Sequence, residues 1–164
     1  MQKTLLTLTI VLMGVGLYGN VAEAKYNQPF RWPTDEHIVT TKFHDDDYIF
    51  KNLFEHAGID LAQPQGAPVY AAKDGVVTVK HIDDSINYAY VMLVHKKNFS
   101  SVYGEMNQIV VEEGQAVKRG DLIGYSGGLP GTVGAGAYST GPHLHFEIRK
   151  SGMPVNPTKY LKNK

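Results

Sequence analysis

Two short segments of the sequence carry residue types that bind metals and move protons. One contains His56, Gly58 and Asp60, and the other contains His143 and His145. Side chains two apart on an extended strand share a face, so each segment would present its polar groups on one side. Two neutral imidazoles and one carboxylate suit zinc, and a catalytic zinc site keeps its fourth position for water or substrate. The spacing therefore predicts a zinc centre that makes water nucleophilic near neutral pH.

Neither segment is specific when taken alone. A His-x-His pair also arises by chance on a strand that faces solvent, and a His-x-x-x-Asp spacing is weaker still. The chain has seven histidines, which raises this chance background. The rest of the sequence must therefore decide whether the two segments form one site.

Composition limits the classes of protein that the chain can represent. Its 164 residues, 43% of them hydrophobic, fit one compact domain. Lys plus Arg and Asp plus Glu both total 16, so the chain lacks the excess of basic residues that is typical of a nucleic-acid-binding protein. The absence of cysteine excludes disulfides, thiolate metal sites and a lipid-modified cysteine.

The first 24 residues have the pattern of an export signal. Lys3 gives a positive start, 5–17 form an apolar stretch, and Ala22-Glu23-Ala24 is a small-x-small cleavage site. The apolar stretch falls short of the roughly 20 residues that a spanning helix needs. We therefore expect cleavage, no stable membrane anchor, and a mature protein in the periplasm, the cell envelope or the medium.

The mature chain divides into a lead-in and a domain. Residues 25–48 are polar and poorly periodic, which predicts an extended lead-in, and 49–164 would form the domain. Strands are expected at 69–72, 75–81, 88–95, 100–103, 108–111, 121–126 and 143–149. No helical stripe exceeds two turns. The expected fold class is all-β, with mostly antiparallel sheets closing as a sandwich or folded sheet.

Two loops stand out within this pattern. The glycine-rich stretch 127–136 fits neither a core strand nor a helix, so we expect a mobile surface loop. Because it precedes the histidine pair, it is expected to form a wall of a binding groove, with a plain linker as the alternative. The acidic run 45–47 is expected to be a solvated loop, with a calcium site as the alternative.

Six segments between Phe30 and Leu161 carry a family resemblance. They are 56–60, 66–77, 102–104, 114–124, 139–147 and 154–157, with the sequences HAGID, GAPVYAAKDGVV, VYG, GQAVKRGDLIG, STGPHLHFE and PVNP. These segments resemble the lysostaphin-type zinc endopeptidases, cell-wall hydrolases that cut peptide links of peptidoglycan. The resemblance implies a compact all-β peptidase domain of the duplicated-hybrid-motif type.

The resemblance also implies roles for individual residues. His56, Asp60 and His145 match the ligands of the catalytic Zn²⁺. His143 matches the group that orients the attacking water or stabilises the oxyanion. The family places a further catalytic histidine in a Tyr-Gly-His stretch, and this chain has Glu105 there.

The departure at Glu105 leaves two functions open. A glutamate can accept a proton from the attacking water, as in other zinc peptidases, so Glu105 would be the general base. The alternative is a catalytically weak or silent protein that binds the cell wall or regulates a hydrolase. We expect hydrolysis of peptidoglycan peptides, because the three ligand positions are all filled. The sequence does not indicate an oligomeric state, and a monomer is assumed.

Other features receive plainer interpretations. Segments 72–77 and 114–121 resemble the turns of biotinyl or lipoyl carrier domains, but the chain has no Met-Lys pair for the cofactor. Packing or surface roles are expected for the remaining histidines and for three tyrosines near the motifs, which are His37, His44, His81, His95, Tyr103, Tyr125 and Tyr138. Among the histidines, His44 is the one that the lead-in could bring near the metal. For the three tyrosines, the alternative to packing is to line a groove for stem peptides.

Overall fold

The computed structural model describes residues 28–83 and 88–162, so the expected export signal lies outside the described residues. The elements in chain order are β1 (Phe30–Arg31), β2 (Val39–Thr41), β3 (Ile59–Ala62), β4 (Pro68–Tyr70), β5 (Gly75–Asp83), β6 (Tyr88–Val94), β7 (Phe99–Gly104), β8 (Met106–Ile109), β9 (Ala116–Val117), β10 (Leu122–Ser126), β11 (His143–Lys150), β12 (Met153–Val155), the 3₁₀ helix η1 (Pro157–Lys159) and β13 (Leu161–Lys162). Within the described ranges, no helix has the length and hydropathy of a membrane span.

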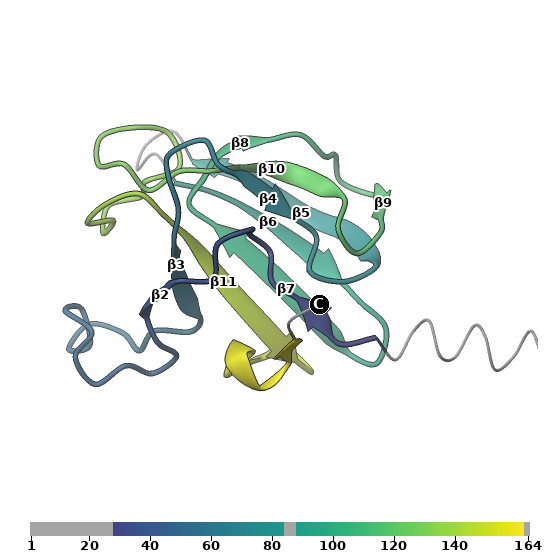
Figure 1. The fold of residues 1–164 in the computed structure, drawn as a ribbon, viewed down its shortest axis with the longest axis horizontal. Helices are drawn as coiled ribbons and strands as arrows, with labels where there is room; N and C mark the ends of the chain where they lie inside the picture. The colour runs from purple at the N-terminus through teal and green to yellow at the C-terminus, as the bar shows by residue number, and fades with distance from the viewer. Residues whose placement is uncertain (1–27, 84–87, 163–164) are drawn as a thin grey trace, which may run out of the picture.

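Two antiparallel sheets make up most of the fold. The eight-stranded sheet has the order β2-β3-β11-β7-β6-β5-β9, and β12 pairs with β11. The three-stranded sheet has the order β4-β10-β8 and lies across the larger one (Figure 1). Among the described strands, only β1 and β13 pair in parallel. The predicted all-β, mostly antiparallel fold is confirmed.

Each of the seven predicted strand ranges overlaps an observed strand, whereas the shortest strands were missed. The unpredicted ones are β1, β2, β9, β12 and β13, each of two or three residues, whereas β3 overlaps the extended segment expected at 56–60 but has other bounds. A strand this short does not complete a recognisable alternation. In β3 the first three residues are all buried, which removes the alternation altogether. Tertiary pairing rather than local pattern therefore defines these strands.

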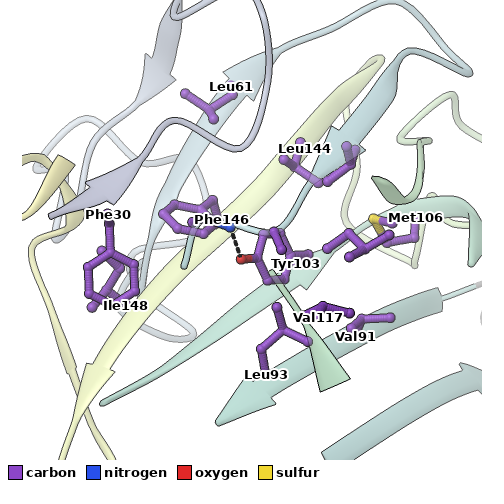
Figure 2. Close-up of a cluster of buried hydrophobic side chains, with 14 of the residues drawn as sticks. Phe30, Leu61, Val91, Leu93, Tyr103, Met106, Val117, Leu144, Phe146 and Ile148 are labelled. Atoms are coloured by element: carbon purple, nitrogen blue, oxygen red, sulfur yellow. Dashed lines mark hydrogen bonds between the residues drawn. The ribbon is translucent and has the colours of Figure 1, made fainter. Parts of the chain in front are cut away.

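The core lies between the two sheets and centres on Tyr103. Figure 2 shows its ring between Phe146 and Met106, and its exposed fraction is 0%. The buried hydroxyl accepts hydrogen bonds from the Ala72 backbone N–H at 2.7 Å and from the Ser101 hydroxyl at 3.0 Å. The expected packing role of Tyr103 is thus observed. Phe30, from the predicted lead-in, also belongs to this core.

Replacing Tyr103 with Phe should destabilise the protein without changing its fold. The variant leaves the buried Ala72 N–H without its acceptor, which costs about 1–3 kcal/mol of unfolding free energy. Chemical denaturation measures this loss. Tyr160→Phe is the control, since Tyr160 packs on Phe99 by its ring. Equal stabilities of the two variants would contradict the structural role of the Tyr103 hydroxyl.

Candidate metal centre

The candidate site begins with the register of β11, which lies between β3 and β7. His145 stands opposite Asp60 on β3 and opposite Gly104 on β7. Leu144 and Phe146 are fully buried in the core, so the alternation turns the histidine side chains to the opposite face. The predicted orientation of this strand is therefore present.

Three donor atoms converge at this face. The Nε2 atom of His56 lies 3.0 Å from Asp60 Oδ1 and 3.1 Å from His145 Nδ1. The His145 Nδ1 atom lies 3.0 Å from the same Asp60 oxygen. Zinc in a tetrahedral site at 2.0–2.1 Å from each ligand separates the donors by roughly 3.3 Å. The triad of His56, Asp60 and His145 therefore fits one metal ion of this kind.

His56 reaches the triad from a loop rather than from a strand. The two-residue spacing predicts His56, Gly58 and Asp60 on one strand face, whereas β3 starts at Ile59. A Cβ atom at Gly58 would collide with the carbonyl oxygen of Phe146. Glycine is thus required at position 58 for the close backbone approach to β11.

Hydrogen bonds fix the orientation of the imidazoles. The Nδ1 atom of His56 donates to the Lys42 carbonyl at 2.7 Å, which leaves Nε2 with a lone pair toward the triad. The Nε2 atom of His145 lies 3.2 Å from Glu147 Oε1. The other Glu147 oxygen accepts from Arg149 Nε at 2.6 Å. This arrangement resembles the carboxylate–histidine pairs that support metal ligands.

The electrostatics of the triad favour a cation at its centre. Burial alone would raise the pKa of Asp60, but His145 and His56 outweigh it and hold that pKa far below its usual value. Burial would also lower the pKa of His145, yet Asp60 and Glu147 raise it to about 10. Carboxylates that stabilise a protonated imidazole this strongly also attract a divalent ion, which would displace the proton from His145.

Glu105 and His143 form a second pair beside the triad. Glu105 lies between β7 and β8 with a φ of 58°, a conformation that side-chain-bearing residues rarely adopt. Its Oε2 atom contacts His143 Nε2, and His143 Nδ1 donates to the Gly141 carbonyl at 2.7 Å. Burial raises the pKa of Glu105 against the opposing effect of His143. His143 has a raised pKa because Glu105 outweighs the effect of burial.

A cavity of about 590 Å³ opens over the triad and the Glu105–His143 pair. Its walls come from 42–58 and from the loop before β11, which lie at the same end of the large sheet (Figure 1). The two walls touch where the rings of Phe50 and Phe54 lie 5.0 and 5.5 Å from the ring of Tyr138. The cavity is thus a groove with aromatic sides and a polar floor.

The glycine-rich loop contributes to this groove as expected. Ala135 and Gly136 line the cavity, and Ala135 is fully buried. The backbone of Gly134 packs directly on that of Met106. The interpretation as a groove wall is therefore supported by its position, whereas its mobility stays a prediction.

The remaining histidines and the acidic run lie outside the triad. His44 pairs with Glu55 at 3.2 Å on the surface, His37 stacks on Trp32, and His81 packs against Tyr90. His95 is buried, with its ring nitrogens 2.8 Å from the Asp74 carbonyl and from the Ser101 hydroxyl. In the part of the chain that the structure describes, the triad is the only cluster of three potential metal-binding side chains, which leaves the acidic run 45–47 without one.

Several residues of the site were not predicted from the sequence. Glu147 continues the two-residue period of His143 and His145, so the alternation of β11 could have identified it. Tyr48 and Tyr88 line the cavity, but no local pattern marks them. Of the three tyrosines considered as groove residues, Tyr138 lines the cavity.

Residues 54–157 match the model of peptidase family M23. The chain belongs to this family. It is 42% identical over 102 residues to the DD-carboxypeptidase/endopeptidase Mpg of Neisseria meningitidis, covering 62% of this chain and 22% of that protein. It is 35% identical over 137 residues to the peptidoglycan DD-endopeptidase ShyA of Vibrio cholerae, covering 82% of this chain and 29% of that protein. The chain thus spans less than a third of these relatives.

Solved structures agree with the M23 assignment. A zinc-containing peptidase from Vibrio cholerae has a TM-score of 0.68 and 31% identity, covering 84% of this chain and 40% of that one. The solution structure of lysostaphin has a TM-score of 0.65 at 19% identity, covering 85% of this chain and 58% of that one. The second similarity shows the fold, and the expected lysostaphin-type architecture is confirmed.

Glu147→Gln should weaken the binding of a divalent metal at the triad while leaving this M23 domain folded. The amide keeps the shape of the side chain but loses the charge that supports His145, so affinity should fall about 10- to 100-fold. Competition with a chromophoric chelator measures the change. Glu112→Gln, which removes an exposed carboxylate paired with Lys80, is the control. Equal metal affinities of the two variants would rule out a supporting role for Glu147.

Proposed function

We propose that this chain is an exported zinc endopeptidase that hydrolyses peptide links of bacterial peptidoglycan. The observation that carries the proposal is the triad of His56, Asp60 and His145 at the floor of a groove, in a chain of family M23. The names of Mpg and ShyA support the substrate class. The expected export signal, residues 1–24, supports a site of action outside the cytoplasm.

In this proposal the triad holds the metal, and the Glu105–His143 pair handles protons. Bound zinc polarises a peptide carbonyl and lowers the pKa of water. Glu105 accepts a proton from the attacking water at Oε2, a buried oxygen with no well-oriented hydrogen bond in the described structure. His143 Nε2, which contacts this Glu105 oxygen, stabilises negative charge on the carbonyl oxygen of the substrate. The Lys42 carbonyl and Glu147 hold the two ligand imidazoles in place.

The groove suits an extended peptide. Its aromatic sides bury apolar parts of a stem peptide, whereas the polar floor faces the peptide link that is cut. Tyr48 packs its ring 4.9 Å from that of His56, which places a hydroxyl-bearing wall beside the metal ligands. A single copy of the domain contains the whole groove, so the proposal needs no second subunit.

A cell-wall-binding protein without turnover is the second candidate, and Glu105 is the observation that favours it. A related fold at 28% identity occurs in the SpoIIQ–SpoIIIAH pore forming complex. The two candidates differ in one measurement, which is the release of soluble peptides from purified peptidoglycan by the zinc-loaded protein. Release supports the endopeptidase, and co-sedimentation without release supports the binding protein.

His145→Ala should abolish zinc retention. The variant removes one of three protein ligands and leaves too few donors for a stable site. Elemental analysis after gel filtration measures bound zinc. His81→Ala is the control, because His81 is exposed and lies outside the triad. One equivalent of zinc in the His145 variant would refute the ligand assignment.

Glu105→Gln should silence hydrolysis while zinc stays bound. Removing a general base lowers turnover by roughly 10²- to 10⁴-fold, whereas the triad is untouched. Peptide release and zinc content are measured on the same sample. Unchanged release would exclude the base role.

Glu105→His restores the family pattern, and a gain in wall lysis over the parent would identify the parent as a weakened relative.

A further inference from the structure

A second cavity, of about 660 Å³, lies at the end of β7 opposite to the triad. We call this cavity the basic pocket, because its lining includes Lys73, Lys96, Lys118 and Arg119. They come from the turn before β5, the β6–β7 connection and the turn before β10, on the side of β9 in Figure 1. Three separate loops thus converge to bring positive charge into one concavity.

The positive charge of the basic pocket is compensated only in part by its own lining. Asp74 is the one acidic residue of that lining, and its Oδ1 atom accepts from the Arg119 backbone N–H at 2.8 Å. The Asp74 Oδ2 atom lies 3.8 Å from Lys118 Nζ. Lys73, Lys118 and Arg119 therefore share one carboxylate within the lining, and Lys96 has an interaction of its own.

Two of these cations bind neutral main-chain groups. Arg119 Nε donates to the Pro29 carbonyl at 3.2 Å, and Lys73 Nζ donates to the Gln28 carbonyl. A carbonyl orients a cation but carries no net charge. Burial, and then repulsion from neighbouring cations, lowers the pKa of both Lys73 and Arg119, which agrees with an excess of positive charge. An anion in the pocket would relieve that repulsion.

We propose that the basic pocket binds an anionic polymer of the cell envelope through its phosphate or carboxylate groups. The volume is that of a pocket for a whole small molecule or a polymer segment and exceeds what a single ion fills. Val76 and Val94 supply an apolar wall, which suits the carbon skeleton between the charged groups of such a chain. A polymer segment can enter this concavity, whereas the surface of a flat bilayer meets only its rim.

The position of the pocket gives this binding a use. Five residue steps separate Phe99 from Gly104 along β7, which is roughly 17 Å at the rise of an antiparallel strand. A wall polymer held at one end of β7 raises the local concentration of peptide links at the other end. This use rests on the proposed function, whereas the anion binding itself does not.

The test compares two pairs of substitutions with the same change in net charge. Lys118→Gln/Arg119→Gln removes two cations of the pocket, and Lys51→Gln/Lys159→Gln removes two exposed lysines outside its lining. Calorimetry with long-chain polyphosphate and with polyglutamate measures affinity. The pocket pair should bind at least one of these probes roughly tenfold more weakly than the parent. The control pair should stay within about twofold.

Further arms make the outcome decisive. Lys118→Arg/Arg119→Lys should retain binding, which separates loss of charge from misfolding. His145→Ala should also bind the polyanion, so a failure of the peptidase proposal is distinguishable. Equal weakening in both pairs, or no binding to either probe by the parent, would overturn the proposal. Tighter binding to phosphatidylglycerol-containing vesicles than to either polymer would overturn the choice of a polymer.

Discussion

The pairing of β11 between β3 and β7 is the constraint on which the candidate site depends. Directly opposite residues on antiparallel strands lie about 4.5–5.5 Å apart, so the register alone brings His145 beside Asp60 and Gly104. A slip by one residue would turn His145 into the core and Phe146 into the groove. The complete burial of Leu144 and Phe146 holds the strand against such a slip. The hydrophobic core thus fixes the position of the chemistry.

The sequence predicts those parts of the site that follow from strand alternation. The shared face of His143 and His145 is an example, because it depends on one strand alone. The approach of His56 is different, since it depends on a loop that passes over the Phe146 carbonyl at Gly58. Such a contact joins residues nearly ninety positions apart and leaves no local periodic signal. For His56 and Asp60, the family resemblance supplied what periodicity does not.

The fold shows the same division between local and long-range information. Long strands such as β5 and β11 have enough residues to display their pattern, and the sequence predicts them. β3 carries Asp60 but has four residues and no exposed alternate positions, so only its pairing with β11 and β2 defines it. The groove walls before β3 and before β11 are irregular, and their aromatic contacts follow from the tertiary arrangement.

Glu105 links the geometry of the fold to the choice between hydrolysis and binding. A left-handed backbone costs a residue with a β-carbon about 1–2 kcal/mol, and glycine would adopt it without that cost. Burying a carboxylate adds a further penalty, which His143 offsets only in part. Strained, buried polar groups of this kind are typical of functional sites, because a purely structural role can be filled by a residue that costs less free energy. The conformation at Glu105 therefore favours a side chain that acts on the groove, and a carboxylate beside a metal acts most directly by taking a proton.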